Sequence, residues 1–223
     1  MSLTLAEAKK RIDRILSTYA ASTTSVSLLS DSLTAGKVYE AWVLSVVLER
    51  LRDDEGYNVQ LVNGTQVHLK SSPGPINASY PHFLLRAPGR SSLDVWTDVE
   101  FATLSHKRRG EPGPPSSAFR HELDICVVPR GTSGYPSHDA VLLGVECKNT
   151  SFEKVMARAA LGVRRELSLL CHPRATHFDR WPRALVPADP PSVLMVYATD
   201  PKVTTYQEAG EVFGVGFYHE PML

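Results

Sequence analysis

Two apolar runs that stand close together constrain the fold of this chain more than any other feature. Residues 121–129 read HELDICVVP, and residues 140–149 read AVLLGVECKN. Both runs are rich in residues that favour strands, and the segment between them contains Gly131, Gly134 and Pro136, which suits a hairpin connection. We therefore expect two strands joined as a hairpin.

Helix and strand patterns on both sides of this hairpin predict the other elements. Apolar residues at helical spacing predict helices over 3–19, 33–52, 151–170 and 204–212. Apolar or β-rich runs predict further strands over 59–70, 83–87, 93–103, 193–199 and 216–219. Proline and glycine collect in predicted loops over 71–81, 105–117 and 171–191. This order is typical of an α/β domain with a central mixed β-sheet flanked by helices.

The overall composition excludes several classes of protein. The chain has 223 residues, 43% of them hydrophobic, with 24 Lys and Arg against 24 Asp and Glu, so its formal net charge is zero. These values exclude a polybasic tail, an acidic disordered chain and a collagen-like protein. They leave nucleic-acid binding open, because that depends on the local charge over one face.

The cysteines and the hydropathy pattern bear on location. There are three cysteines, an odd number, and their spacing does not suggest a disulfide framework. No run of about 18 apolar residues is present that would span a membrane. We therefore expect a protein of the reducing cytoplasm that has no membrane partner.

Charged residues in the hairpin strands are the strongest chemical signal. Asp124 lies in the first strand, and Glu146 and Lys148 lie at the end of the second. Burying such charges costs several kcal/mol unless they are paired or bind an ion. If the hairpin brings Asp124 to Glu146, two carboxylates form the oxygen-rich environment that Mg²⁺ or Mn²⁺ prefers. Lys148 can then orient a water or stabilise negative charge on a phosphate. The alternative is a solvated salt bridge between Glu146 and Lys148 on an edge strand.

These residues resemble the motif of the PD-(D/E)XK nuclease superfamily, whose fold is called restriction endonuclease-like. The motif reads Glu-Leu-Asp at 122–124 and Glu-Cys-Lys-Asn at 146–149. The sequence GKVYE at 36–40 also resembles the first core helix of Mrr-like members, in which a glutamate faces the metal site. The resemblance implies a nuclease-like domain over 33–223, preceded by an N-terminal helix and connector over 1–32. Leu123 replaces the proline of the motif, and the helix over 151–170 lacks the glutamine of RecB-like members.

The resemblance also implies individual roles. It implies catalytic roles for four side chains: Asp124, Glu146, Lys148 and Glu40. Asp124 and Glu146 would bind Mg²⁺ or Mn²⁺ together with the backbone carbonyl of Cys147, and Lys148 would lie near the attacking water. Glu40 would reach the metal directly or through water. Glu122 lies on the same strand face as Asp124, so it is either a reserve ligand or an exposed acid at the start of the strand.

Two basic stretches flank the motif. Residues 105–120 hold four positive charges and one negative charge, and residues 153–183 hold seven and three, whereas the first 60 residues hold seven and eight. We expect a nucleic-acid backbone to contact the basic residues of both stretches. They are Lys107, Arg108, Arg109, Arg120, Lys154, Arg158, Arg164 and Arg165. The alternative is an ordinary solvated surface.

The expected function is that of a metal-dependent endonuclease that hydrolyses phosphodiester bonds in DNA, in restriction, defence or repair. The sequence contains no recognisable DNA-reading module, so specificity would come from the loops over 71–81 and 105–117, from the partner in a homodimer, or from another subunit of a larger complex. Two alternatives stay open. One is an inactive nuclease-fold protein that binds nucleic acid or serves in assembly, and the other is a nuclease directed at RNA.

Overall fold

The computed structural model of the chain describes residues 4–20, 27–30, 32–110 and 112–222. Part of the predicted connector over 20–32 lies outside these residues. The strands are β1 (Asn58–Val62), β2 (His82–Arg86), β3 (Leu93–Ala102), β4 (Arg120–Pro129), β5 (Leu143–Lys148), β6 (Leu169–Ala175), β7 (Leu185–Asp189), β8 (Val193–Ala198) and β9 (Val215–His219). The helices are α1 (Leu5–Ser17), α2 (Ala35–Asp53), α3 (Leu104–Arg109), α4 (Lys154–Leu167) and α5 (Gln207–Glu211), with short 3-10 turns over 117–119, 138–140 and 201–206.

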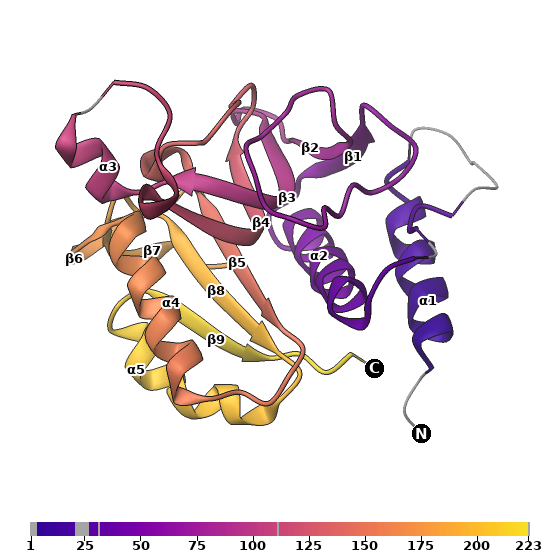
Figure 1. The fold of residues 1–223 in the computed structure, drawn as a ribbon. Coiled ribbons are helices and arrows are strands. Elements are labelled where there is room, and N and C mark those ends of the chain that lie inside the picture. Colours follow the sequence, from indigo (N-terminus) through magenta and orange to yellow (C-terminus); the bar gives the residue numbers. More distant parts are fainter. Residues whose placement is uncertain (1–3, 21–26, 31, 111, 223) are drawn as a thin grey trace.

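A seven-stranded sheet in the order β1-β2-β3-β4-β5-β8-β9 forms the middle of the molecule (Figure 1). Neighbours from β1 to β5 are antiparallel, whereas β5, β8 and β9 run parallel. The expected central mixed sheet flanked by helices is confirmed. The predicted hairpin is confirmed as well, because Cys126 in β4 is paired with Gly144 in β5.

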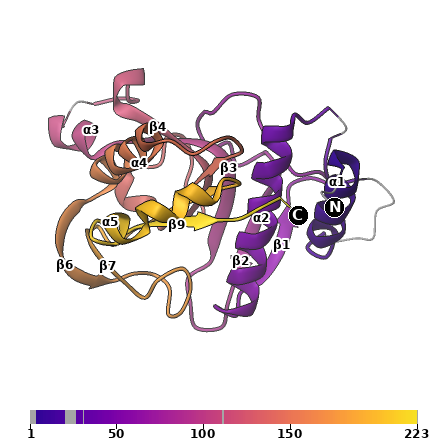
Figure 2. The same cartoon turned by 90° about the horizontal axis from the view of Figure 1, so that it is seen from below.

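Helices pack on both faces of this sheet (Figures 1 and 2). In β8, Val193, Met195 and Tyr197 belong to the core that contains α1 and α2, whereas the residues between them belong to the core under α4. This alternation is the pattern of a central strand buried on both faces. We call the two sides of the sheet the α2 face and the α4 face.

Strands β3 and β4 exchange faces at matching positions. In β3, Val95 packs on the α2 face, but Val99 packs on the α4 face. In β4, Leu123 packs on the α4 face, but Ile125 packs on the α2 face. Regular alternation would keep residues separated by two or four positions on one face. The exchange coincides with Asp98, whose φ of 53° lies in the left-handed region that few residues other than glycine adopt.

Two predictions in the first half of the chain need correction. The strand predicted over 59–70 ends at Val62, because Asn63 turns the chain with a φ of 60°. The loop predicted over 105–117 begins as helix α3. This helix forms because the Thr103 hydroxyl accepts a hydrogen bond from the amide of His106 at 3.2 Å and Gly110, with φ of 68°, ends it.

Two predictions in the second half also need correction. The helix predicted over 151–170 is shorter, since α4 starts at Lys154 and ends at Leu167, where β6 follows. The loop predicted over 171–191 contains most of β6 and all of β7, which pair as a two-stranded antiparallel sheet. Val186 and Ala188 anchor this ribbon, because both are buried in the core of the α2 face.

The hydropathy of the helices bears on membrane insertion. Within the described part of the chain, none of the helices combines the length and the apolar character needed to cross a bilayer.

Candidate metal centre

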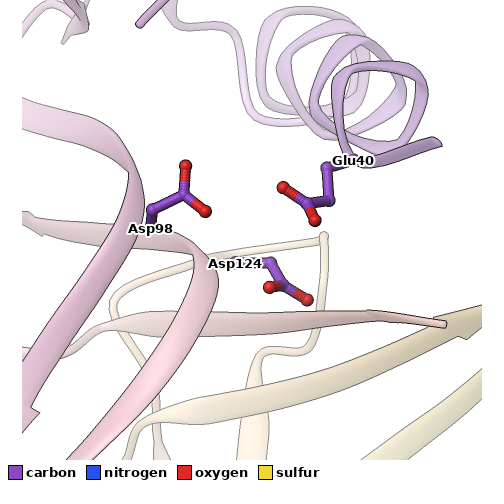
Figure 3. Close-up of side chains that lie close together, drawn as sticks. All are labelled: Glu40, Asp98 and Asp124. Atoms are coloured by element: carbon purple, nitrogen blue, oxygen red, sulfur yellow. The ribbon is translucent and has the colours of Figure 1, made fainter. Parts of the chain in front are cut away.

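Three carboxylates from three elements meet on the α2 face of the sheet. Glu40 comes from α2, Asp98 from β3 and Asp124 from β4, and one oxygen of each lies within 4.8 Å of the others (Figure 3). Asp98 is fully buried and Asp124 is 8% exposed. We call these three residues the acidic cluster. Oxygen ligands about 2.1 Å from one Mg²⁺ ion stand at most about 4.2 Å apart, so the cluster can hold a metal ion after a small adjustment.

Helix α2 supplies a lysine beside the glutamate. Lys37 lies one turn before Glu40, and its Nζ donates to the Glu40 carboxylate at 2.6 Å and also to Asp98. Burial alone would lower the pKa of Lys37, but the hydrogen bonds to Asp98 and Glu40 outweigh it and raise the pKa. Burial raises the pKa of Glu40 to about 7, although Lys37 opposes this change. The lysine is therefore a built-in counter-cation for two of the three carboxylates.

The segment over 70–76 runs beside β3 and contacts Asp98. The Asp98 carboxylate accepts a hydrogen bond from the backbone amide of Lys70 at 2.8 Å. The backbone carbonyl of Asp98 accepts one hydrogen bond from the amide of Gly74 at 3.1 Å and another from the Lys70 Nζ at 3.1 Å. Pairing between β2 and β3 ends at Val95, so this segment takes the place that β2 leaves. The carboxylate is thereby held by Lys37 on one oxygen and by the amide of Lys70 on the other.

The Asp124 side chain lies where β4 and β5 separate. The β4–β5 pairing runs as far as Ile125 and Val145, and the next residue, Asp124, instead accepts a hydrogen bond from the amide of Cys147 at 2.6 Å. Burial raises the pKa of Asp124, while the nearby Lys148 opposes the shift. Because the strands part at this point, we infer that Asp124 is the member of the cluster closest to the residues of β5.

Glu146 and Lys148 form an ion pair beside Asp124. The Lys148 Nζ donates to the Glu146 carboxylate at 2.7 Å. Burial and the Asp124 charge raise the pKa of Glu146 to about 7, against the effect of Lys148. In the pairing of β5 with β8, Glu146 stands beside Val196 and Lys148 stands beside Ala198. Val196 and Ala198 belong to the α4 face. In the described part of the chain, Glu146 is not one of the three carboxylates that meet within 4.8 Å. Its role as a ligand stays a prediction.

The two remaining predicted ligands are the Glu122 carboxylate and the Cys147 carbonyl, and both belong to residues near Asp124. Glu122 is exposed at the start of β4, and its pKa is raised by desolvation and by the charges of Asp124 and Asp98. Cys147 turns its amide toward Asp124, as described above, and the role of its carbonyl stays a prediction.

Asp98 is the site residue that the sequence analysis missed. It stands in the run Val-Trp-Thr-Asp-Val, where it interrupts a strand that is otherwise apolar and β-rich. The β3–β4 register pairs Thr97 with Ile125 and Val99 with Leu123, so Asp98 stands opposite Asp124. An acid in a buried strand, facing another acid on the paired strand, is the signal that could have revealed it.

Most of the predicted nucleic-acid contacts lie at the surface. Lys154, Arg158 and Arg165 are exposed on α4, and Arg108 is exposed on α3. The other residues at this end of the sheet have partners within the protein: Lys107 pairs with Asp139, Arg109 lies over the Phe119 ring, and Arg120 donates to Glu100 at 3.0 Å and also to the Tyr135 hydroxyl at 2.5 Å.

Arg164 does not belong to this surface. It is 4% exposed and donates to the Ser192 carbonyl, so a nucleic acid cannot contact it. The prediction was wrong because Arg164 falls at helical spacing with the buried Ala157, Ala160 and Leu167 and therefore points inward.

The charges of the whole site favour a divalent cation. Five carboxylates gather around it: Glu40, Asp98, Glu122, Asp124 and Glu146. Three lysines accompany them: Lys37, Lys70 and Lys148. Burial is the main cause of the raised pKa values near 7 of Glu40 and Glu146, and the negative charge of Asp124 adds to it. The donor set, made of carboxylate oxygens, suits Mg²⁺ or Mn²⁺.

Comparisons of the chain with models of protein families, with curated proteins and with solved structures found no significant match.

Proposed function

We propose that this protein is a nuclease that depends on a divalent metal and hydrolyses phosphodiester bonds in DNA. The observation that carries this proposal is that Glu40, Asp98 and Asp124 lie within 4.8 Å of one another on the α2 face of the sheet. Carboxylates at this distance repel one another, and a cation that binds between them compensates that cost. Mg²⁺ is the expected ion, and Mn²⁺ replaces it in vitro.

Each residue of the site has a role in this proposal. Glu40, Asp98 and Asp124 hold the metal ion. When bound, the ion lowers the pKa of a water ligand and neutralises charge on the phosphate. Lys148 orients the attacking water or stabilises negative charge on the phosphate in the transition state. Glu146 positions the Lys148 ammonium through their ion pair, and its pKa near 7 suits a group that accepts a proton at neutral pH.

The order of the elements supports the assignment to the restriction endonuclease-like fold. If β1, β2, α3, β6 and β7 are left out, helix α2 is followed by the antiparallel strands β3, β4 and β5, then by α4 and the parallel strand β8. This order is the one that the motif resemblance implies for a nuclease core. The three acids lie on the elements that the resemblance implies for them. Glu40 is on α2, Asp124 is on β4 and Glu146 is on β5.

The basic surface supports a nucleic acid as the substrate. The amide of Ser105 in α3 donates to Glu166 in α4 at 3.1 Å, so α3 lies at the C-terminal end of α4, the end that carries Arg165 (Figure 1). Arg120 begins β4 at this end of the sheet, four residues before Asp124, which corresponds to about 13 Å along a strand. A phosphate backbone that crosses α3 therefore passes within a few nucleotides of the acidic cluster.

Cleavage assays with matched variants test the proposal. The purified protein is incubated with supercoiled plasmid, linear duplex, single-stranded DNA and RNA, in Mg²⁺, Mn²⁺ or EDTA. Asp98→Asn and Asp124→Asn each remove a ligand charge and are expected to lower the rate by about 10³-fold or more. Asp94→Asn is the control, because Asp94 is also a buried acid of β3 but lies outside the acidic cluster. It is expected to cleave at the wild-type rate.

The outcomes separate the possible functions. Cleavage of DNA that disappears in EDTA and in both cluster variants supports the proposal. Cleavage of RNA alone supports the RNA-directed alternative. Metal and DNA binding without cleavage of any substrate supports an inactive binding protein. Equal rates for the wild type, both cluster variants and the EDTA samples overturn the nuclease assignment.

A further inference from the structure

Arg164 is a buried cation without an anionic partner. Its side chain points inward from α4, and the residue is 4% exposed. One terminal nitrogen donates to the Ser192 carbonyl at 2.8 Å, and the other donates to the Ser192 hydroxyl at 3.0 Å. A guanidinium has five N–H donors, so three of them find no acceptor among the residues that the structure describes. Burial lowers the pKa of Arg164 to about 10, and no neighbouring carboxylate offsets this effect.

Arg164 is one of the residues that line a cavity of about 260 Å³. The cavity lies between α4, the β6–β7 ribbon and the end of α5, at the side of the molecule away from α1 (Figures 1 and 2). Its wall is mostly apolar and includes Leu161, Leu169, Pro187 and Phe213, and its polar lining residues are Arg164, Arg165 and Ser168. Phe213 is 41% exposed, so the cavity has an apolar rim at the surface.

We propose that this cavity binds a small amphipathic carboxylate, whose carboxylate lies on Arg164 and whose apolar part lies along Leu161, Pro187 and Phe213. A buried guanidinium that has only neutral acceptors is costly, and a carboxylate would supply the missing charge and acceptors. The apolar wall excludes ligands that are polar all around. The volume restricts the ligand to a molecule smaller than a typical drug.

The site is independent of the proposed nuclease centre. Arg164 belongs to α4, whereas the acidic cluster lies on the α2 face, and no residue is common to both. Failure of one proposal therefore leaves the other standing.

Calorimetry and thermal melting of the intact protein test the proposal, with sodium octanoate as the probe. 1-Octanol has the same chain without the charge, and inorganic phosphate has charge without a chain. Arg164→Met keeps the length of the side chain but removes its charge. Arg158→Met is the control, because Arg158 is an exposed arginine of α4 outside the cavity. Octanoate is expected to bind the wild type and Arg158→Met equally, and Arg164→Met at least about tenfold more weakly.

The other results have defined meanings. Octanol binding as tightly as octanoate, phosphate binding as tightly as octanoate, or no binding of octanoate at millimolar concentration each overturns the proposal. If circular dichroism shows that Arg164→Met does not fold, Leu161→Trp replaces it, because this change fills the cavity and keeps the arginine. Loss of octanoate binding by Leu161→Trp then supports the proposal, and unchanged binding overturns it.

Discussion

The acidic cluster and the Arg164 cavity retain buried charge in opposite ways. At the cluster, carboxylates and lysines lie together, and the carboxylates are in excess. At the cavity, one guanidinium lies among neutral groups. In both places the fold leaves part of the charge uncompensated, and the sign of that remainder indicates the sign of the ligand. The cluster therefore favours binding of a cation, and the cavity favours binding of an anion.

The largest expected effect on stability comes from removing the most buried acid of the cluster. Asp98→Ala leaves the Lys70 amide without its acceptor, leaves Lys37 with Glu40 alone, and places alanine at a positive φ. We expect the free energy of unfolding to fall by about 3 kcal/mol or more in EDTA, measured by urea denaturation.

Two further substitutions at the same position separate the causes. Asp98→Gly removes the backbone strain but keeps the loss of charge, whereas Asp98→Asn keeps an acceptor and tolerates the positive φ. If Asp98→Ala is as stable as the wild type, the charges of the cluster are not tightly paired, and the contrast with the cavity disappears.

A smaller effect is expected when the internal counter-cation is removed. Lys37→Met leaves Glu40 and Asp98 without the ammonium that bridges them. The variant should melt at a lower temperature in EDTA but bind Mn²⁺ about tenfold more tightly, since the metal no longer competes with the lysine, and this corresponds to about 1.4 kcal/mol. A titration of melting temperature with Mn²⁺ measures the change. A Mn²⁺ response equal to that of the wild type would show that the lysine and the metal do not share a place.

The independence of the two regions predicts additive ligand effects. Saturating Mn²⁺ and saturating octanoate should each raise the free energy of unfolding, and together they should give the sum within about 0.5 kcal/mol. Arg164→Met should lose the octanoate contribution alone, and Asp124→Asn the Mn²⁺ contribution alone. Strong coupling between the two ligands would mean that the faces of the sheet communicate.

The smallest effect is expected from an exposed ion pair, which belongs to neither region. Lys107→Ala should change stability by less than about 1 kcal/mol, since Lys107 and Asp139 are both exposed. Burial opposes ionisation of Asp139, but hydrogen bonds from Lys107 and Ser137 outweigh it and lower its pKa to about 2.

This shift defines a pH window. A carboxylate whose pKa is lower in the folded state stabilises the fold above its ordinary pKa, and the contribution is lost as the pH falls through about 2. In Lys107→Ala, an NMR titration should show the pKa of Asp139 returning toward its ordinary value. An unchanged pKa would mean that the ion pair does not form in solution.

The sequence predicted the parts of the fold that depend on local pattern. The hairpin of β4 and β5 and the central strand β8 were visible as apolar or β-rich runs, and the helix that carries Glu40 was visible as apolar residues at helical spacing. The β6–β7 ribbon was not visible, because its stability comes from burial of Val186 and Ala188 against residues distant in the chain, while its prolines indicate a loop.

The candidate site shows the same division. Glu40 and Asp124 were found because each stands in a recognisable motif. Asp98 was missed because its approach to them depends on a backbone angle and on the β3–β4 register, which no single segment reveals. Arg164 was assigned to the surface because its charge was counted without its position on the helix.

The exchange of faces in β3 and β4 has a consequence for how these two strands find their alignment during folding. Both strands switch sides at positions that stand opposite each other, so their apolar side chains reach the correct layers only in one alignment. If β3 slid by one residue, Val99 and its neighbours would turn to the wrong layer and Asp98 would lose its lysine partners. The residues that we assign to chemistry therefore also disfavour a shifted pairing of β3 with β4.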